Sequence, residues 1–126
     1  MQKEIISTTN APGAIGPYSQ AVKIGGMLYT SGQLPINAVT GELINDDVRS
    51  AAKQCLENLN AILTEAGTSL DKVVKTLVFV SDLNDFAAIN EVYAQYFKDN
   101  YPARSCVQVA KLPLNAKLEI EAIALV

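Results

Sequence analysis

The 126-residue chain contains no histidine. Without an imidazole, the protein cannot use a Ser-His or Cys-His nucleophile system, and it cannot build a histidine-rich zinc site. The only two cysteines, Cys55 and Cys106, are too few for a four-cysteine metal site. We therefore expect no bound metal, and any chemistry must come from the other polar side chains or from backbone groups.

Charged residues are also scarce, at 18% of the chain against 49% apolar residues. The 10 basic residues are outnumbered by 13 acidic ones, which gives a net charge of −3. This balance argues against a nucleic-acid partner, because binding to phosphates requires a basic surface. The low charge also leaves little to cover the surface of a lone monomer, a first indication of burial beyond one chain.

Long apolar runs are missing as well. The chain has no apolar stretch of 20 residues and no secretory leader, so we expect no membrane contact. In a chain without an export signal, we expect both cysteines to be reduced thiols, which predicts a cytoplasmic protein. The glycine patterns of phosphate-binding loops, G-x-x-x-x-G-K and G-x-G-x-x-G, do not occur.

The length predicts a single domain covering residues 1–126. Gly25-Gly26, between two short apolar runs, indicates a tight hairpin turn. Asp46 or Asp47 is the expected cap of a first amphipathic helix that Gly67 ends. The expected strands are residues 3–7, 18–24, 27–31, 73–80, 105–110 and 117–125, and the first helix is expected at residues 47–66.

A second helix, capped by Asp82 or Asn84, is expected to end before Pro102. Its predicted buried stripe is Phe86, Ile89, Tyr93, Tyr96 and Phe97. The order of elements predicts an α+β fold, in which one mixed sheet carries both helices on one face. Because the strands at 73–80 and 117–125 are apolar on both faces, we expect a second copy of the chain over the other face. The result would be a closed homo-oligomer with its sites between subunits.

Residues 102–107, Pro-Ala-Arg-Ser-Cys-Val, are the most informative segment. Successive side chains of a strand lie on opposite faces of a sheet, so Arg104 and Cys106 share one face, and Ser105 and Val107 share the other. We expect the apolar set to meet the helices and Arg104 to point to the face between subunits. An unpaired guanidinium is costly there, and a ligand carboxylate would match its planar fork.

Glu119 and Glu121 share one face of the last expected strand. Two like charges at this spacing favour pairing, solvation or protonation of one of them. A partly buried glutamate could orient or deprotonate a water, whereas a solvated strand start is the plainer interpretation. A structural ion pair of either carboxylate with Arg104 also stays open. Nothing near Cys106 in sequence would form its thiolate, so we expect it to act through its backbone groups.

Further candidates lie in the first third of the chain. Tyr18 follows Gly16-Pro17 and could offer its hydroxyl to a ligand, although packing is the more common role of such a tyrosine. Ser31 and Gly32 end an expected strand, where the glycine would allow backbone N–H groups to approach a ligand closely.

Four separated segments of the chain resemble the RidA/YjgF family of reactive-intermediate deaminases. The most specific is residues 102–107, followed by Leu112-Pro113 and by residues 118–121, Leu-Glu-Ile-Glu, at the family's spacing. Residues 14–21 (AIGPYSQA), 30–33 (TSGQ) and 78–86 (VFVSDLNDF) support the resemblance. It covers essentially the whole chain.

The resemblance implies a chorismate-mutase-like fold and a homotrimeric, barrel-like assembly with three sites at subunit interfaces. It also implies hydrolysis of 2-iminobutanoate and 2-iminopropanoate to 2-oxo acids and ammonia, without a cofactor. By their places in the motifs, Arg104 binds the substrate carboxylate and Glu119 positions the attacking water. The substrate-binding residues that the resemblance implies are Tyr18, Ser31, Gly32, Asn90, Arg104 and Cys106.

Two other functions stay open at this point. A non-catalytic or regulatory module that binds small carboxylates would use Arg104 equally well, so that only Glu119 separates it from an enzyme. A ribonuclease is disfavoured by the acidic composition and by the lack of histidine.

Overall fold

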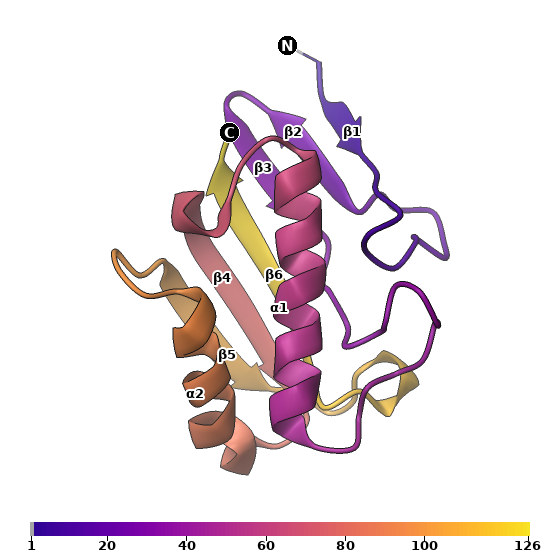
Figure 1. The fold of residues 1–126 in the computed structure, drawn as a ribbon, viewed down its shortest axis with the longest axis vertical. Helices are drawn as coiled ribbons and strands as arrows, with labels where there is room; N and C mark the ends of the chain where they lie inside the picture. The colour runs from indigo at the N-terminus through magenta and orange to yellow at the C-terminus, as the bar shows by residue number, and fades with distance from the viewer. Residues whose placement is uncertain (1) are drawn as a thin grey trace.

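The computed structural model describes residues 2–126, in which one six-stranded sheet lies behind two helices (Figure 1). The strand order is β1-β2-β3-β6-β4-β5, and only the pairing of β4 with β5 is parallel. The strands are β1 (Glu4–Ile6), β2 (Ala21–Ile24), β3 (Met27–Thr30), β4 (Val73–Val80), β5 (Ala103–Gln108) and β6 (Leu118–Leu125). The predicted single mixed sheet is confirmed.

The turn between β2 and β3 forms where Gly25-Gly26 predicted it. Both glycines have positive φ angles, 60° and 78°. A two-residue turn with two left-handed residues matches the twist of the flanking strands, and glycine adopts that conformation without strain.

β3 separates from β6 at Thr30. Regular pairing reaches Tyr29 opposite Ile123, and the Thr30 hydroxyl then accepts the N–H of Ala122 at 3.0 Å. Pairing resumes only at Gln33, which faces Ile120. Residues 31 and 32 therefore lie in an irregular stretch beside the middle of β6, where their backbone is not part of the regular ladder.

Helix α1 (Val48–Glu65) begins at Asp47, whose carboxylate accepts the backbone N–H of Ser50 at 2.9 Å. Just beyond its end, Gly67 has a φ of 85°, so the expected cap and the expected terminating glycine are both confirmed. The helix buries an apolar face against β6, and the Cys55 thiol there donates to the Leu118 carbonyl. Each fully buried leucine or isoleucine on this face contributes roughly 1.5–3 kcal/mol.

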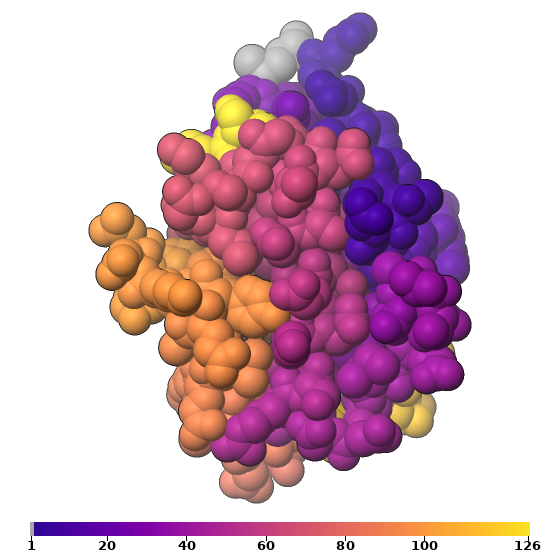
Figure 2. Space-filling model, in the orientation of Figure 1, coloured from indigo at the N-terminus to yellow at the C-terminus, as the bar shows by residue number. Residues whose placement is uncertain are grey.

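Helix α2 (Phe86–Tyr96) follows a short 3₁₀ turn over Leu83–Asp85, which Asp82 caps by accepting the N–H of Asn84. The hydroxyl of Tyr93 bonds that of Thr76 at 2.8 Å, which fastens α2 to β4. Side chains of α1 and α2 together cover this face of the sheet (Figure 2). Both helices therefore pack on one face, as predicted.

The predicted buried stripe of α2 is correct at three of its five positions. Ile89, Tyr93 and Phe97 are buried, whereas Tyr96 is half-buried and Phe86 is exposed. Phe86 is exposed because it lies at the first turn of the helix, over the edge strand β5 rather than over the centre of the sheet.

The sheet face away from the helices is open and largely apolar, although Glu119 and Glu121 of β6 also lie on it. Tyr29, Val107 and Leu125 on it are 45%, 46% and 48% exposed. Large apolar side chains gathered on one face are typical of an interaction surface. A covering copy of the chain remains a prediction. No helix within residues 2–126 combines the length and the apolar composition needed to cross a membrane.

Candidate functional site

Arg104 lies on the edge strand β5, and α2 provides the partners of its side chain. The guanidinium carbon lies 4.8 Å from the centre of the Tyr93 ring and 5.3 Å from that of Phe86. Its Nη1 donates to Oδ1 of Asn90 at 2.8 Å. Cation–π contacts of this kind contribute about 0.5–2 kcal/mol, depending on exposure. Two rings and one amide thus hold the half-buried guanidinium in one orientation. We call Arg104, Asn90, Phe86 and Tyr93 the arginine group.

The expectation that Arg104 points away from the helices is wrong. Arg104 pairs with Thr76 on the helix-bearing face, while Ser105 and Val107 face the open side. The error came from assigning the apolar side chains to the helix face, although the open face is apolar too. The aromatic rings of α2 make the helix side acceptable for a guanidinium, since they replace part of its hydration by cation–π contact.

The ion pair that the sequence left open is not formed within one chain. Glu119 and Glu121 lie on the opposite face of the sheet, and among residues 2–126 no carboxylate oxygen lies within 4.0 Å of Arg104. Instead, the guanidinium borders a cleft of about 410 Å³ between α2 and the start of β5. The lining residues are Asn90, Tyr93, Ala94, Tyr101, Pro102 and Arg104.

Phe86 and Tyr93 were predicted only as core residues, but both rings contact the Arg104 guanidinium. A signal was present: Phe86, Asn90 and Tyr93 are spaced by four and three residues and therefore share one face of a helix. That face meets β5, the strand that carries the arginine.

Glu119 lies on the open face of β6 and packs against Gly32. A Cβ atom at position 32 would lie 2.6 Å from Cδ and 2.8 Å from Cγ of Glu119, so any side chain there would displace the carboxylate. Burial raises the pKa of Glu119, and the nearby Glu121 carboxylate raises it further. Burial is thus the main cause of the raised pKa of Glu119, and the like charge of Glu121 is the second.

The loop before β2 is held beside Gly32. The Ser31 hydroxyl donates to the Ser19 carbonyl at 2.6 Å, and the Ser31 N–H donates to the Gln20 carbonyl at 2.8 Å. This side chain therefore fastens the loop that carries Tyr18. Tyr18 and Gly32 line a second cleft, of about 420 Å³. We call Glu119, Gly32, Ser31 and Tyr18 the glutamate group.

Cys106 lies on the same face as Arg104 and pairs with Val78 of β4. Burial raises the pKa of its thiol, and the opposing effect of Arg104 is smaller. This direction agrees with the expectation that the cysteine does not act as a thiolate.

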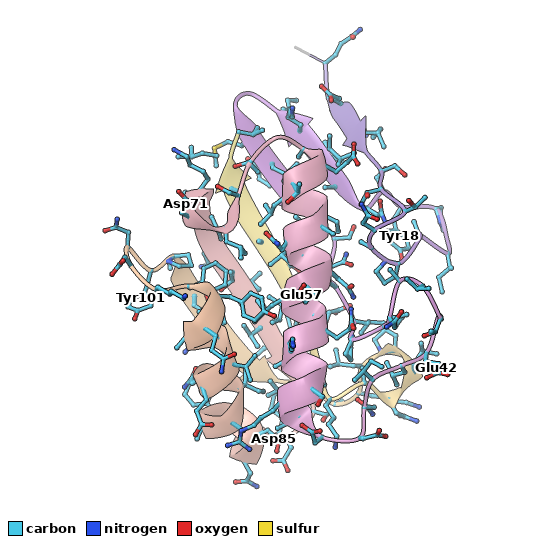
Figure 3. The ribbon with its side chains drawn as sticks, viewed as in Figure 1. Tyr18, Glu42, Glu57, Asp71, Asp85 and Tyr101 are labelled. Atoms are coloured by element: carbon cyan, nitrogen blue, oxygen red, sulfur yellow. The ribbon has the colours of Figure 1, made fainter. Side chains whose placement is uncertain are left out.

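One chain does not bring the two groups together. Arg104 and Glu119 lie on opposite faces of the sheet and on strands separated by β4. In Figure 3, Tyr101, which lines the cleft beside Arg104, and Tyr18 lie on opposite sides of the molecule. A site that uses both Arg104 and Glu119 therefore requires residues from two copies.

Comparison with known proteins places this architecture in a family. The family model described as Endoribonuclease L-PSP matches residues 8–126. The "Putative reactive intermediate deaminase TdcF" of Escherichia coli strain K12 is 57% identical over 125 residues, covering 97% of this chain and 96% of its own. The RutC family protein y4sK of Sinorhizobium fredii is 56% identical over 120 residues, covering 95% of both chains.

Solved structures agree with the fold. Escherichia coli TdcF with bound serine has a TM-score of 0.94 at 55% identity and covers 98% of both chains. The YjgF gene product from Escherichia coli has a TM-score of 0.93 at 51% identity, covering 97% of this chain and 98% of that one. Matches of this length and identity confirm the resemblance seen in the sequence motifs. The chain therefore belongs to the RidA/YjgF/TdcF family.

Proposed function

We propose that this protein hydrolyses the reactive 2-imino acids 2-iminobutanoate and 2-iminopropanoate to 2-oxo acids and ammonia in the cytoplasm, without a cofactor. Arg104 binds the substrate carboxylate and Glu119 positions the attacking water. Family membership supports the reaction class, since a relative 57% identical carries the name "Putative reactive intermediate deaminase TdcF".

The surroundings of the Arg104 side chain are the strongest support for this proposal. Its guanidinium is oriented by Asn90 and two aromatic rings, borders a cleft and has no carboxylate partner within residues 2–126. A guanidinium fixed in this way offers a preorganised fork for a planar carboxylate, because little side-chain entropy is lost on binding. A 2-imino acid carries that carboxylate next to its reacting carbon.

The site is completed by a second copy of the chain. The apolar open face of the sheet supports a closed homotrimer, in which the arginine group of one subunit meets the glutamate group of the next. β5 supports this arrangement because, as an edge strand, it leaves one side free for a neighbour. In such a site, backbone groups of Gly32 and Cys106 contact the substrate, and Tyr18, Ser31 and Asn90 complete the pocket.

The chemistry requires few groups. The carbon of a protonated imine is electrophilic, so water adds to it once both are held in attack geometry. Glu119 accepts a proton from the attacking water as the C–O bond forms, and the imine nitrogen becomes an amine. Glu119 then returns this proton to the amine, and the C–N bond breaks as the C=O bond forms. The hydroxyl proton passes to Glu119 or to water, which leaves the 2-oxo acid and ammonia. Every step uses a carboxylate or water, which fits a chain without histidine.

The direct test is a coupled assay in which a threonine dehydratase generates 2-iminobutanoate. Formation of 2-oxobutanoate is timed with and without this protein. We expect faster formation with the protein, and equal rates would refute the proposed activity. A non-catalytic carboxylate-binding module is the second candidate, because the related TdcF was crystallised with bound serine, which is not an imine.

The raised pKa of Glu119 predicts the acidic limb of the pH profile. Since the carboxylate form accepts the proton, the rate should fall as the pH drops through a pKa above that of an ordinary glutamate. Glu121→Gln removes a like charge, lowers the pKa of Glu119 and should shift this limb to lower pH. The measurement is the pH dependence of kcat/KM, after subtraction of spontaneous hydrolysis. Glu42→Gln, in an exposed loop, should leave the limb in place, and an unshifted limb in Glu121→Gln would contradict the role of Glu119.

Gly32→Ala tests the contact beneath Glu119. The added methyl group would overlap the end of a flexible side chain, so the fold should survive while the carboxylate moves. We expect kcat to fall about 10- to 100-fold, because small displacements of a catalytic group are costly. The free energy of unfolding, measured by thermal denaturation, should change by no more than about 1 kcal/mol. Gly13→Ala, where nothing lies within 4 Å, is the control for stability, and unchanged turnover in Gly32→Ala would contradict the assigned position of Glu119.

A further inference from the structure

A second, mostly apolar cleft of about 420 Å³ adjoins the glutamate group. It lies between the loop before β2 and the turn before β6, and Gly32 is part of its wall. The larger apolar side chains on its lining include Pro12, Ile15, Tyr18, Leu34, Ile36 and Leu114. An ethyl or methyl group, the side chain of the two substrates proposed above, would fill only a small part of this space.

Two aliphatic side chains on the lining are largely exposed: Ile15 at 87% and Leu114 at 61%. Leu114 has a φ of 60°, a left-handed conformation that costs a leucine about 1–2 kcal/mol. Asn45 holds the end of this turn, because its side chain donates to the Asn115 carbonyl at 3.1 Å and accepts the Lys117 N–H at 3.0 Å. The fold thus maintains a strained backbone where it presents an apolar side chain, a feature that is common at binding sites.

The cleft lies beside Glu119, where it could receive the side chain of the substrate. Gly32 is shared by the cleft and by the packing surface of the Glu119 carboxylate. A substrate carbon that reacts beside Glu119 would therefore lie at one end of the cleft, and the substituent on that carbon would extend into it.

We propose that this cleft binds the side chain of the 2-imino acid, and that it favours aliphatic side chains longer than ethyl, up to the branched four-carbon side chain of the leucine type. Ile15 and Leu114 determine this preference. The assignment of the reacting carbon rests on the function proposed above, whereas the preference among carboxylate ligands is a binding property that can be measured without turnover.

Calorimetric titration with 2-oxo acids tests the preference. The series is 2-oxopropanoate, 2-oxobutanoate, 2-oxopentanoate and 4-methyl-2-oxopentanoate, which share the carboxylate and the carbonyl and differ in side chain. We expect Kd to fall about fourfold for each added methylene, the value that corresponds to apolar burial. A Kd that is flat or that rises beyond 2-oxobutanoate would overturn the proposal.

The Leu114→Asn variant tests whether Leu114 determines the preference for longer side chains. Asparagine tolerates the left-handed backbone, so the turn should persist while the apolar side chain is lost. We expect about a tenfold weaker affinity for 4-methyl-2-oxopentanoate and less than about a twofold change for 2-oxopropanoate. Val39→Asn, an exposed apolar residue outside this cleft, is the matched control and should leave the whole series unchanged. Equal weakening of all four ligands in Leu114→Asn would contradict a side-chain subsite.

Ile15→Asn, in the exposed loop on the opposite side of the cleft, repeats the test if the Leu114 variant fails to fold, and the same two outcomes apply. The rates of imine hydrolysis separate this proposal from the one before it. A Kd series that follows the expected order, in a protein that accelerates no imine, would refute the deaminase and support the subsite. Acceleration of 2-iminobutanoate together with a flat Kd series would support the deaminase and refute the subsite.

Discussion

Replacing Arg104 by alanine is expected to lower kcat/KM for 2-iminobutanoate by about 100- to 1,000-fold, the usual cost of losing a charged, hydrogen-bonded partner of a ligand carboxylate. The fold should remain intact, because Arg104 lies on the edge strand and among residues 2–126 forms no ion pair. Arg104→Lys should recover only part of the loss, since an ammonium cannot reproduce the planar fork that Asn90 and the rings of α2 orient.

Arg49→Ala is the matched control. Arg49 forms an exposed ion pair with Glu91 on the helices and lines neither cleft, so its loss removes the same charge outside the proposed site. We expect little change in rate, because exposed pairs of this kind contribute about 1 kcal/mol or less to stability. An Arg104→Ala variant with a nearly full rate would show that the carboxylate is bound elsewhere.

Replacing Glu119 by glutamine is expected to lower kcat by about 100- to 10,000-fold, the range that a positioned general base supplies. Binding of 2-oxobutanoate, measured by calorimetry, should be nearly unchanged, because the amide keeps the shape of the carboxylate against Gly32. This pair of results separates an enzyme from a binding module, since Arg104 serves both and only catalysis needs the proton acceptor.

Glu65→Gln, at the exposed end of α1, removes an equal charge outside the site and should leave kcat unchanged. Two results would contradict the catalytic role of Glu119. One is full turnover in Glu119→Gln, and the other is loss of ligand binding in step with turnover, which would make Glu119 a binding residue.

Local chemistry made much of the fold predictable. The Gly25-Gly26 turn and the Asp47 cap each depend on one or two residues and their neighbours, and both form as the sequence indicates. The start of α2 was less exact, because the turn capped by Asp82 precedes the helix and shares its sequence pattern. The strand expected at residues 18–24 begins at Ala21, and the strand expected at residues 105–110 runs from Ala103 to Gln108. Short-range signals therefore defined the elements better than their boundaries.

The site was harder to predict, because its geometry depends on contacts between distant segments. Alternation correctly separated Arg104 from Val107 but could not assign faces, since both faces of the sheet are apolar near β5. The contact of Gly32 with Glu119 depends on the separation of β3 from β6 at Thr30, which leaves no pattern in the sequence. The motifs indicated the candidate residues, and in the structure Arg104 and Glu119 lie on opposite faces of the sheet.

In the proposed trimer, Arg104 of one subunit and Glu119 of the next act on one substrate. The most direct test mixes Arg104→Ala and Glu119→Gln subunits, each inactive alone, by unfolding and refolding them together at equal concentrations. If the two kinds of subunit assemble at random into trimers, about one quarter of the interfaces combine an intact Arg104 with an intact Glu119. About one quarter of the wild-type rate should then return. If both residues acted from the same subunit, no mixed site would be intact, and a mixture as inactive as its components would contradict the account.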